Sequence, residues 1–124
     1  MKIGTDIVAI ERIQKALDKF GERYKKRFLS DDEIEKLSQK SDSIAGYWAA
    51  KEAISKALGC GIGQALEFHD IILYKDSLNA PHFRLSSKAQ KVHQIESSSL
   101  SISHDGGFAI AVVAITQTPK ENNE

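Results

Sequence analysis

The stretch "YWAAKEAISKALGCGIG", residues 47–63, decides the fold class of this chain. Its apolar and small residues follow the spacing of an α-helix, and Gly59 stands where a helix commonly ends on a left-handed glycine. Three charged residues interrupt this otherwise apolar helix: Lys51, Glu52 and Lys56. A helix that is apolar almost all round is usually buried. We therefore expect one long central helix, from about Ser43 to Leu58.

Shorter patterns surround this helix. Five apolar segments predict strands, at residues 3–10, 66–74, 82–86, 100–103 and 108–115. The first segment is mainly apolar on both faces, which predicts a strand inside a sheet. Further helical patterns cover residues 11–27, with a break at Gly21, the segment after Ser30, and residues 86–95. The pair Asp105-Gly106 predicts a hairpin between the last two strands.

Polar breaks mark where helices begin. Ser30 with Glu33 three residues later forms a capping box, and Ser41 or Asp42 is the expected N-cap of the long helix. The order of elements indicates a single small domain of the α+β or α/β class. We favour α+β, with the long central helix packed on an antiparallel sheet. The domain should cover residues 1–116, followed by a polar tail over residues 117–124.

Composition limits the class of protein. The chain has 124 residues, of which 41% are hydrophobic and 27% charged, which is typical of one globular domain. No apolar run reaches the roughly 20 residues that a membrane-spanning helix needs, so we expect no membrane segment. The single Cys60 cannot form an internal disulfide, which fits a reducing cytoplasm.

Charge is unevenly distributed although the net charge is zero. Residues 1–30 hold eight Lys and Arg against four acids, and the basic residues include Arg12, Arg23 and Arg27. This excess indicates a basic surface for an acidic partner; the alternative is a solvated helix face without a partner. Nucleic acid is not expected, because the pI is about 6.9 and the basic cluster at residues 25–27 is short.

Two isolated carboxylates are candidates for a metal site. Glu52 lies in the apolar helix and Asp6 in an apolar strand, where acids are rare. Glu52 could instead form an i,i+4 salt bridge with Lys56, worth about 0.2–0.5 kcal/mol, and Asp6 could be a strand-end cap. If the two acids converge, they suit Mg²⁺, which takes one or two carboxylates together with substrate phosphates. Lys56 could then neutralise a phosphate oxygen.

Other candidates are weak by themselves. The glycines of "GCGIG", residues 59–63, allow a close approach of the backbone to a phosphate, but they match neither a Walker A loop nor a Rossmann motif. A plain helix cap and turn explains them equally well. His104 at the expected hairpin is unremarkable alone. Cys60 has no histidine placed in the sequence to suggest a catalytic dyad.

Taken together, three segments resemble the holo-[acyl-carrier-protein] synthase family, the short phosphopantetheinyl transferases: "IGTDIVAIERI" (3–13), "AAKEAISKALGCGI" (49–62) and "SISHDGGFAIAVV" (101–113). A weaker match, "RFLSDDE" (27–33), lies between the first two. The resemblance implies an enzyme that moves the 4′-phosphopantetheine arm of coenzyme A onto a serine of apo acyl carrier protein. It further implies Mg²⁺ dependence, a role in fatty acid biosynthesis and a homotrimer with sites at subunit interfaces.

The resemblance also implies roles for single residues. Asp6 and Glu52 match the metal-binding acids, and Lys56 matches the active-site lysine. The loop Gly59–Cys60–Gly61, Pro81 and His104 match contacts to coenzyme A, near the phosphates, the adenine and the 3′-phosphate respectively.

The carrier contact is implied for Arg12, with Arg23 and Arg27 of the same basic stretch as further candidates. Two departures from the family pattern stand out. Cys60 replaces a common threonine, and "NAPH" (79–82) replaces a Gly-Lys-Pro turn.

The mechanism that follows is attack of the carrier serine on the phosphorus attached to pantetheine, with Mg²⁺ next to the pyrophosphate. The group that accepts the serine proton stays open between Glu52, Asp6 and a water at the metal. The rival interpretation is a non-catalytic module that binds coenzyme A or a nucleotide. Such a module needs no pair of metal-binding acids.

Overall fold

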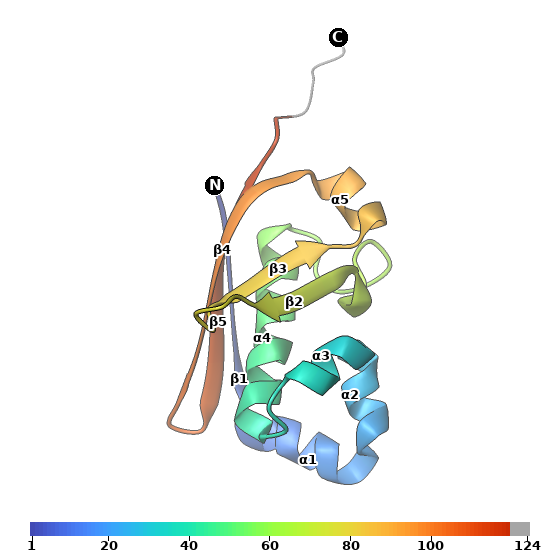
Figure 1. The fold of residues 1–124 in the computed structure, drawn as a ribbon, viewed down its shortest axis with the longest axis vertical. Coiled ribbons are helices and arrows are strands. Elements are labelled where there is room, and N and C mark those ends of the chain that lie inside the picture. Colours follow the sequence, from blue (N-terminus) through green and yellow to red (C-terminus); the bar gives the residue numbers. More distant parts are fainter. Residues whose placement is uncertain (120–124) are drawn as a thin grey trace.

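The computed structural model describes residues 1–119 (Figure 1). In chain order its elements are β1 (Lys2–Ala9), α1 (Ile10–Phe20), α2 (Glu22–Phe28), α3 (Asp31–Lys36), α4 (Ser41–Ala57), the 3₁₀ helix η1 (Phe68–Asp70), β2 (Ile71–Lys75), β3 (Pro81–Leu85), α5 (Ser87–His93), β4 (Ile95–Asp105) and β5 (Phe108–Gln117). Strands β1, β5 and β4 form an antiparallel sheet in that order, and β2 pairs with β3 in a second, two-stranded sheet. The predicted α+β class, with a long central helix on an antiparallel sheet, is confirmed.

Helix α4 is the centre of the molecule. It lies between the three-stranded sheet on one side and helices α1–α3 with strands β2 and β3 on the other (Figure 1). Its buried residues are almost all apolar or small, as the sequence predicts, and they pack on Val113 and Ile115 of the sheet within one hydrophobic core. Removing such side chains from water supplies most of the free energy that holds the helix in place.

The contact between α4 and β1 is unusually close. A Cβ atom at Gly4 would lie 2.0 Å from the carbonyl oxygen of Ala53 and 2.9 Å from the Cβ of Ala57. No side chain fits there, so Gly4 is what allows the strand to lie directly against the helix. Asp6, two residues later on β1, is thereby brought beside the C-terminal half of α4.

Most of the helix ends predicted from local sequence signals are confirmed. Ser30 and Glu33 form both hydrogen bonds of the capping box, α1 stops at Gly21, and the hydroxyl of Ser86 caps α5. Gly59 has a φ of 81° at the end of α4. The predicted N-cap of α4 is wrong, because the helix already includes Ser41 and the cap position holds Lys40 without a side-chain hydrogen bond.

The prediction that β1 lies inside a sheet is wrong within one chain. Among the described strands it pairs only with β5, with Asp6 opposite Ala111, and so forms a sheet edge. Gly4 and Val8 face the core, whereas Ile3 and Ile7 on the other face are 66% and 62% exposed. One apolar face of β1 therefore packs on α4, and the other forms an apolar surface on the outside of the sheet.

Two further boundaries differ from the sequence prediction. The segment 66–74 is not one strand, because the carboxylate of Asp70 accepts a hydrogen bond from the amide of Glu67 and closes a 3₁₀ turn before β2 begins. The predicted hairpin exists, but its two loop residues are Gly106 and Gly107, both with positive φ, and Asp105 is the last residue of β4. A type I′ two-residue turn needs positive φ at both positions, which glycine adopts without strain.

The end of the chain is described only as far as residue 119. Gln117 is the last residue of β5, and its side chain donates to the carbonyl oxygen of His93. Of the expected polar tail over 117–124, residues 120–124 lie outside the described residues. Within the described part, no helix combines the length and hydropathy that crossing a membrane requires.

Candidate active site

Strand β1 and helix α4 bring Asp6, Glu52 and Lys56 together. Nζ of Lys56 donates to Oδ1 of Asp6 at 2.8 Å and to the carbonyl oxygen of Thr5 at 3.3 Å. The Asp6 side chain is 13% exposed and that of Lys56 53%. Lys56 therefore forms its ion pair across two elements, with Asp6, rather than along the helix with Glu52. The i,i+4 salt bridge considered from the sequence is not formed.

Glu52 is the electrostatically perturbed member of this group. Burial raises the pKa of its carboxyl, and the negative charge of Asp6 raises it further, while Lys56 and Arg12 act in the opposite direction. The two carboxylates are therefore close enough to repel each other. The arrangement would gain from a cation placed between them.

The donor set fits a hard divalent cation. Two carboxylates provide only oxygen ligands, and Mg²⁺ prefers oxygen and usually completes its shell with water and substrate phosphates. Over residues 1–119 there is no cluster of three or more His, Cys, Asp or Glu that could hold a metal. An ion held by Asp6 and Glu52 would thus take its remaining ligands from water or substrate.

Of the candidate arginines, Arg12 lies near this group, since its charge acts on Glu52. The guanidinium of Arg12 lies 5.6 Å from the ring centre of Trp48, which is one turn before Glu52 on α4. Arg23 and Arg27 line a hollow of about 330 Å³ on α1 and α2 with Phe20 and Tyr24. Burial raises the pKa of Tyr24, and the charges of Arg12 and Arg27 oppose that shift. The three arginines therefore belong to one basic surface, which we call the α1–α2 arginine surface.

The glycine loop folds back on the end of α4. Gly59 and Gly61 have φ values of 81° and 67°, which only glycine adopts freely. The amides of Cys60 and Gly61 both donate to the carbonyl oxygen of Ser55, at 3.3 and 3.2 Å. The loop is exposed at Cys60, and both positive-φ glycines have open space where a Cβ would stand. The loop begins three residues after Lys56.

Pro81 and His104 lie elsewhere in the chain. Both line a cavity of about 240 Å³ that also includes Asp42, Ser43 and Lys75. Nε2 of His104 lies 3.7 Å from Oδ2 of Asp42.

This cavity does not include the acid pair. Ser43 and Glu52 are nine residues apart on α4, about two and a half turns, so their side chains point to opposite sides of the helix. One chain thus brings together Asp6, Glu52 and Lys56 but holds Pro81 and His104 on the other side of α4.

Two features of this region had no clear signal in the sequence. Lys75 lines the cavity with His104, but a lysine at the end of a strand is common. Lys51 is fully buried and pairs with Glu33 at 2.9 Å. The capping box pointed to Glu33 only as a helix cap, and nothing in the sequence distinguishes Lys51 from Lys56 on the same helix.

Comparison with known proteins decides the family. The model of the 4′-phosphopantetheinyl transferase superfamily matches residues 2–113. The chain is 59% identical to the holo-[acyl-carrier-protein] synthase of a Sulfurovum species, over 93% of this chain and 96% of that protein. The chain belongs to the holo-[acyl-carrier-protein] synthase family. The resemblance seen in the sequence is confirmed, and the protein is an enzyme of the phosphopantetheinyl transferase class.

Solved structures of holo-[acyl-carrier-protein] synthases share this fold. The Helicobacter pylori holo-[acyl-carrier-protein] synthase, solved in complex with coenzyme A, is 51% identical with a TM-score of 0.89, covering 92% of this chain and 99% of that one. The Neisseria meningitidis holo-[acyl-carrier-protein] synthase is 32% identical with a TM-score of 0.84, covering 94% and 98%. The architecture described above is therefore that of holo-[acyl-carrier-protein] synthases.

Proposed function

We propose that this chain transfers the 4′-phosphopantetheine arm of coenzyme A to a serine of apo acyl carrier protein, in the service of fatty acid biosynthesis. The observation that carries the proposal is the convergence of Asp6, Glu52 and Lys56 from two elements. A coenzyme A complex of a relative with 51% identity supports the choice of donor. In the reaction the serine oxygen forms a bond to the phosphorus attached to pantetheine. The bond from that phosphorus to the bridging oxygen breaks, and adenosine 3′,5′-bisphosphate leaves.

Asp6 and Glu52 would hold Mg²⁺, which supplies positive charge beside the pyrophosphate when it is bound. Lys56 would donate to a phosphate oxygen, since its ammonium lies next to the acid pair and is half exposed. A fixed donor of this kind stabilises the charge that develops during phosphoryl transfer. The glycine loop would lie along the phosphates, with Cys60 at its exposed tip.

The serine proton needs an acceptor. In the metal-free protein, burial and the nearby charge of Asp6 raise the pKa of Glu52, whereas a bound Mg²⁺ would oppose that shift. The acceptor therefore stays open between Glu52, Asp6 and a water at the metal. The proton then leaves the site with the product.

A second copy of the chain would complete the site. Pro81 and His104 lie on the opposite side of α4 from Glu52, so contacts to the adenine and 3′-phosphate would come from the neighbouring subunit. The outer face of the three-stranded sheet supports such an assembly, because it exposes large apolar side chains: Ile3, Ile7, Phe108, Ile110 and Val112. We propose a homotrimer with one site at each interface.

The α1–α2 arginine surface would receive the carrier protein, for which an acidic surface is the complementary chemistry. Arg12 is the residue of that surface closest to the acid pair, since its charge acts on Glu52. Neither nucleic acid nor membrane has a role in this proposal. A cytoplasmic location remains our expectation from the single cysteine.

The test is the mass of apo acyl carrier protein after incubation with this protein, coenzyme A and Mg²⁺. We expect a gain of one phosphopantetheine on a single serine, together with release of adenosine 3′,5′-bisphosphate. The rival function, binding of coenzyme A without transfer, predicts a carrier of unchanged mass despite measurable coenzyme A binding. A parallel incubation with a metal chelator separates Mg²⁺-dependent from metal-independent transfer.

A further inference from the structure

A buried ion pair joins Lys51 of α4 to Glu33 of α3. Nζ of Lys51 lies 2.9 Å from Oε1 of Glu33, and the two side chains are 0% and 1% exposed. Nζ also donates to the carbonyl oxygen of Phe68 at 3.2 Å. Neither side chain forms a hydrogen bond or an ion pair with Asp6 or Glu52, and the proposed reaction does not use them.

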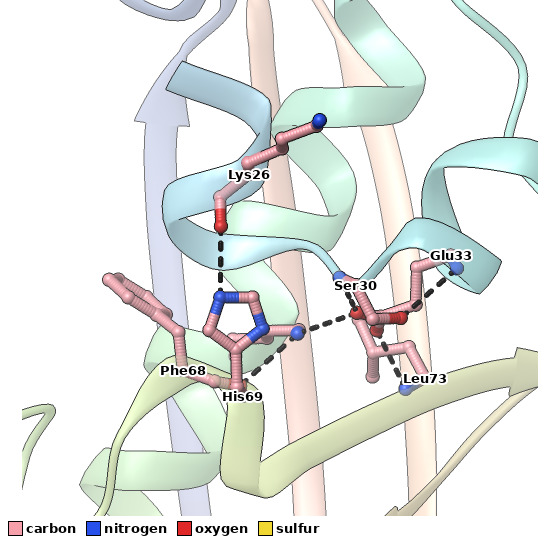
Figure 2. A network of polar contacts seen from close by, with 7 residues as sticks. Lys26, Ser30, Glu33, Phe68, His69 and Leu73 are labelled. Carbon is pink, nitrogen blue, oxygen red and sulfur yellow. Dashed lines mark hydrogen bonds and ion pairs between the residues drawn. The ribbon is translucent and has the colours of Figure 1, made fainter. Parts of the chain in front are cut away.

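The carboxylate of Glu33 accepts three hydrogen bonds. Its Oε1 accepts from the amide of Ser30 at 2.8 Å as well as from Lys51, and its Oε2 accepts from the amide of Leu73 at 2.9 Å (Figure 2). Through these bonds one carboxylate links the start of α3, helix α4 and strand β2. The bond from Lys51 to Phe68 adds η1 to the group.

Stability alone is a poor explanation of such a pair. Removing two charges from water costs several kcal/mol, and replacing a buried ion pair by well-packed apolar residues is often neutral or stabilising. A network with fixed directions does, however, select one arrangement of the elements that it joins. The question is then which arrangement this pair selects.

The residues close to Lys51 and Leu73 in the chain belong to the two parts of the proposed active site. Lys51 immediately precedes Glu52 on α4, and one residue corresponds to about 100° of rotation. Tying Lys51 into the interior therefore fixes the direction in which Glu52 points, toward Asp6 on β1. On the other side, Leu73 lies two residues before Lys75, which lines the cavity with Pro81 and His104.

We propose that the Lys51–Glu33 pair is a positioning device for the active site. It fixes the relative placement of Glu52 on α4 and of the β2 segment that leads to Lys75. This inference rests on the proposed function. Lys51 and Glu33 act through their neighbours and contact neither substrate nor metal. Loss of a group that orients a metal ligand typically lowers metal affinity or activity by about 10–100-fold.

The decisive variant is the double substitution Lys51→Met with Glu33→Leu, because it removes both charges together. It also leaves the amides of Ser30 and Leu73 and the carbonyl oxygen of Phe68 without these bonds. Three quantities are measured: the melting temperature, the affinity for Mn²⁺ with coenzyme A present and no carrier, and kcat with its carrier KM. Free Mn²⁺ is followed by electron paramagnetic resonance, so binding is read without turnover. The matched control is Lys36→Gln with Asp32→Asn, which removes an exposed pair from the same helix α3.

We expect the double variant to melt below the wild type, because these backbone groups lose their partners. Measured well below both melting temperatures, Mn²⁺ affinity and kcat should each fall by about 10–100-fold. The KM for the carrier should stay unchanged, because the bonds of Lys51 and Glu33 include none of the three arginines of the α1–α2 arginine surface. The control variant should match the wild type in all three quantities. A folded double variant that keeps Mn²⁺ affinity and kcat overturns the proposal and leaves a structural pair.

If the double variant does not fold, Glu33→Gln takes its place, since it keeps the shape of the side chain and loses the charge. Weakened Mn²⁺ binding in folded Glu33→Gln supports the inference, and wild-type binding overturns it. Failure of the proposed function looks different. In that case the wild-type protein itself shows no Mn²⁺ binding or no transfer, and both proposals fall together.

Discussion

Lys56 on α4 donates a 2.8 Å hydrogen bond to Asp6 on β1, although 50 residues separate them in the chain. The bond exists because Gly4 lets the strand lie against the helix with no side chain between them. It leaves Glu52, one turn earlier on α4, without Lys56 as an ion-pair partner. The ammonium and the two carboxylates thus form a compact group. The carboxylates can bind a cation, and the ammonium can bind a phosphate.

Lys56→Met tests whether this ammonium serves catalysis. The ion pair is half exposed at Lys56, so its loss should cost only about 0–1 kcal/mol of unfolding free energy. If the ammonium stabilises the transferred phosphate, kcat should fall by about 10²–10³-fold. Melting temperature and kcat are measured on the same preparation, with Lys56→Arg as the control that keeps the charge and should recover part of the rate. A lower melting temperature with normal kcat would leave Lys56 a structural role only.

Glu52 should titrate above the ordinary glutamate value of about 4.3 in the metal-free protein, because burial and Asp6 raise its pKa. The native state then holds this proton more tightly than the unfolded chain does. Its contribution to stability should therefore increase as the pH falls through the raised pKa and be lost as the pH rises through it. Carboxyl carbon NMR follows the titration directly.

The variant Asp6→Asn separates the two causes of this shift. It removes the neighbouring charge but keeps the burial, so the Glu52 midpoint should move down and still remain above the ordinary value. Glu52→Gln should lose the pH dependence of stability assigned to this group. An identical Glu52 midpoint in wild type and Asp6→Asn would contradict the closeness of the two carboxylates.

Gly4→Ala should separate β1 from α4. The added Cβ would meet the Ala53 carbonyl oxygen and the Ala57 methyl group, and overpacking of this kind typically costs about 1–3 kcal/mol or more. Because Asp6 lies two residues along, transfer activity should fall together with the melting temperature. Gly63→Ala is the matched control, since a Cβ added there would meet no other atom within 4 Å. Equal melting temperatures for the two variants would refute the close contact.

Arg12→Glu should weaken use of the carrier protein more than binding of coenzyme A. Steering by an exposed charge fades with salt, because the Debye length falls from about 10 Å at 0.1 M to about 3 Å at 1 M. The carrier KM of the wild type should therefore rise with salt toward that of the variant. A carrier KM that is independent of salt in both proteins would argue against the α1–α2 arginine surface as the docking site.

His104→Ala should raise the KM for coenzyme A far more than the KM for an analogue without the 3′-phosphate. The reason is the position of His104 in a cavity that also holds Lys75, so that two basic side chains can face one phosphate. Steady-state kinetics with both donors measures the difference. An equal rise in KM for the two donors would mean that His104 contributes through its contact with Asp42 instead.

Signals that act within a few residues were predicted correctly from the sequence. The Ser30–Glu33 capping box and the left-handed Gly59 at the end of α4 each depend on backbone geometry over two to four residues. The hairpin was also predicted, although its loop residues are Gly106 and Gly107 rather than Asp105 and Gly106. The same holds for the family, because its motifs are contiguous stretches around Asp6, Glu52 and His104. Such features need no knowledge of where the rest of the chain lies.

Only the tertiary structure decided what the charged residues do. Lys51 and Lys56 look alike in the sequence, yet one is buried against Glu33, 18 positions away, and the other reaches Asp6, 50 positions away. The exposed outer face of β1 and the separation of His104 from Glu52 also depend on how strands and helix pack. An apolar pattern predicts that a face of a helix or strand will be buried, but not which segment will cover it. Burial and charge pairing depend on three-dimensional neighbours rather than on order in the chain.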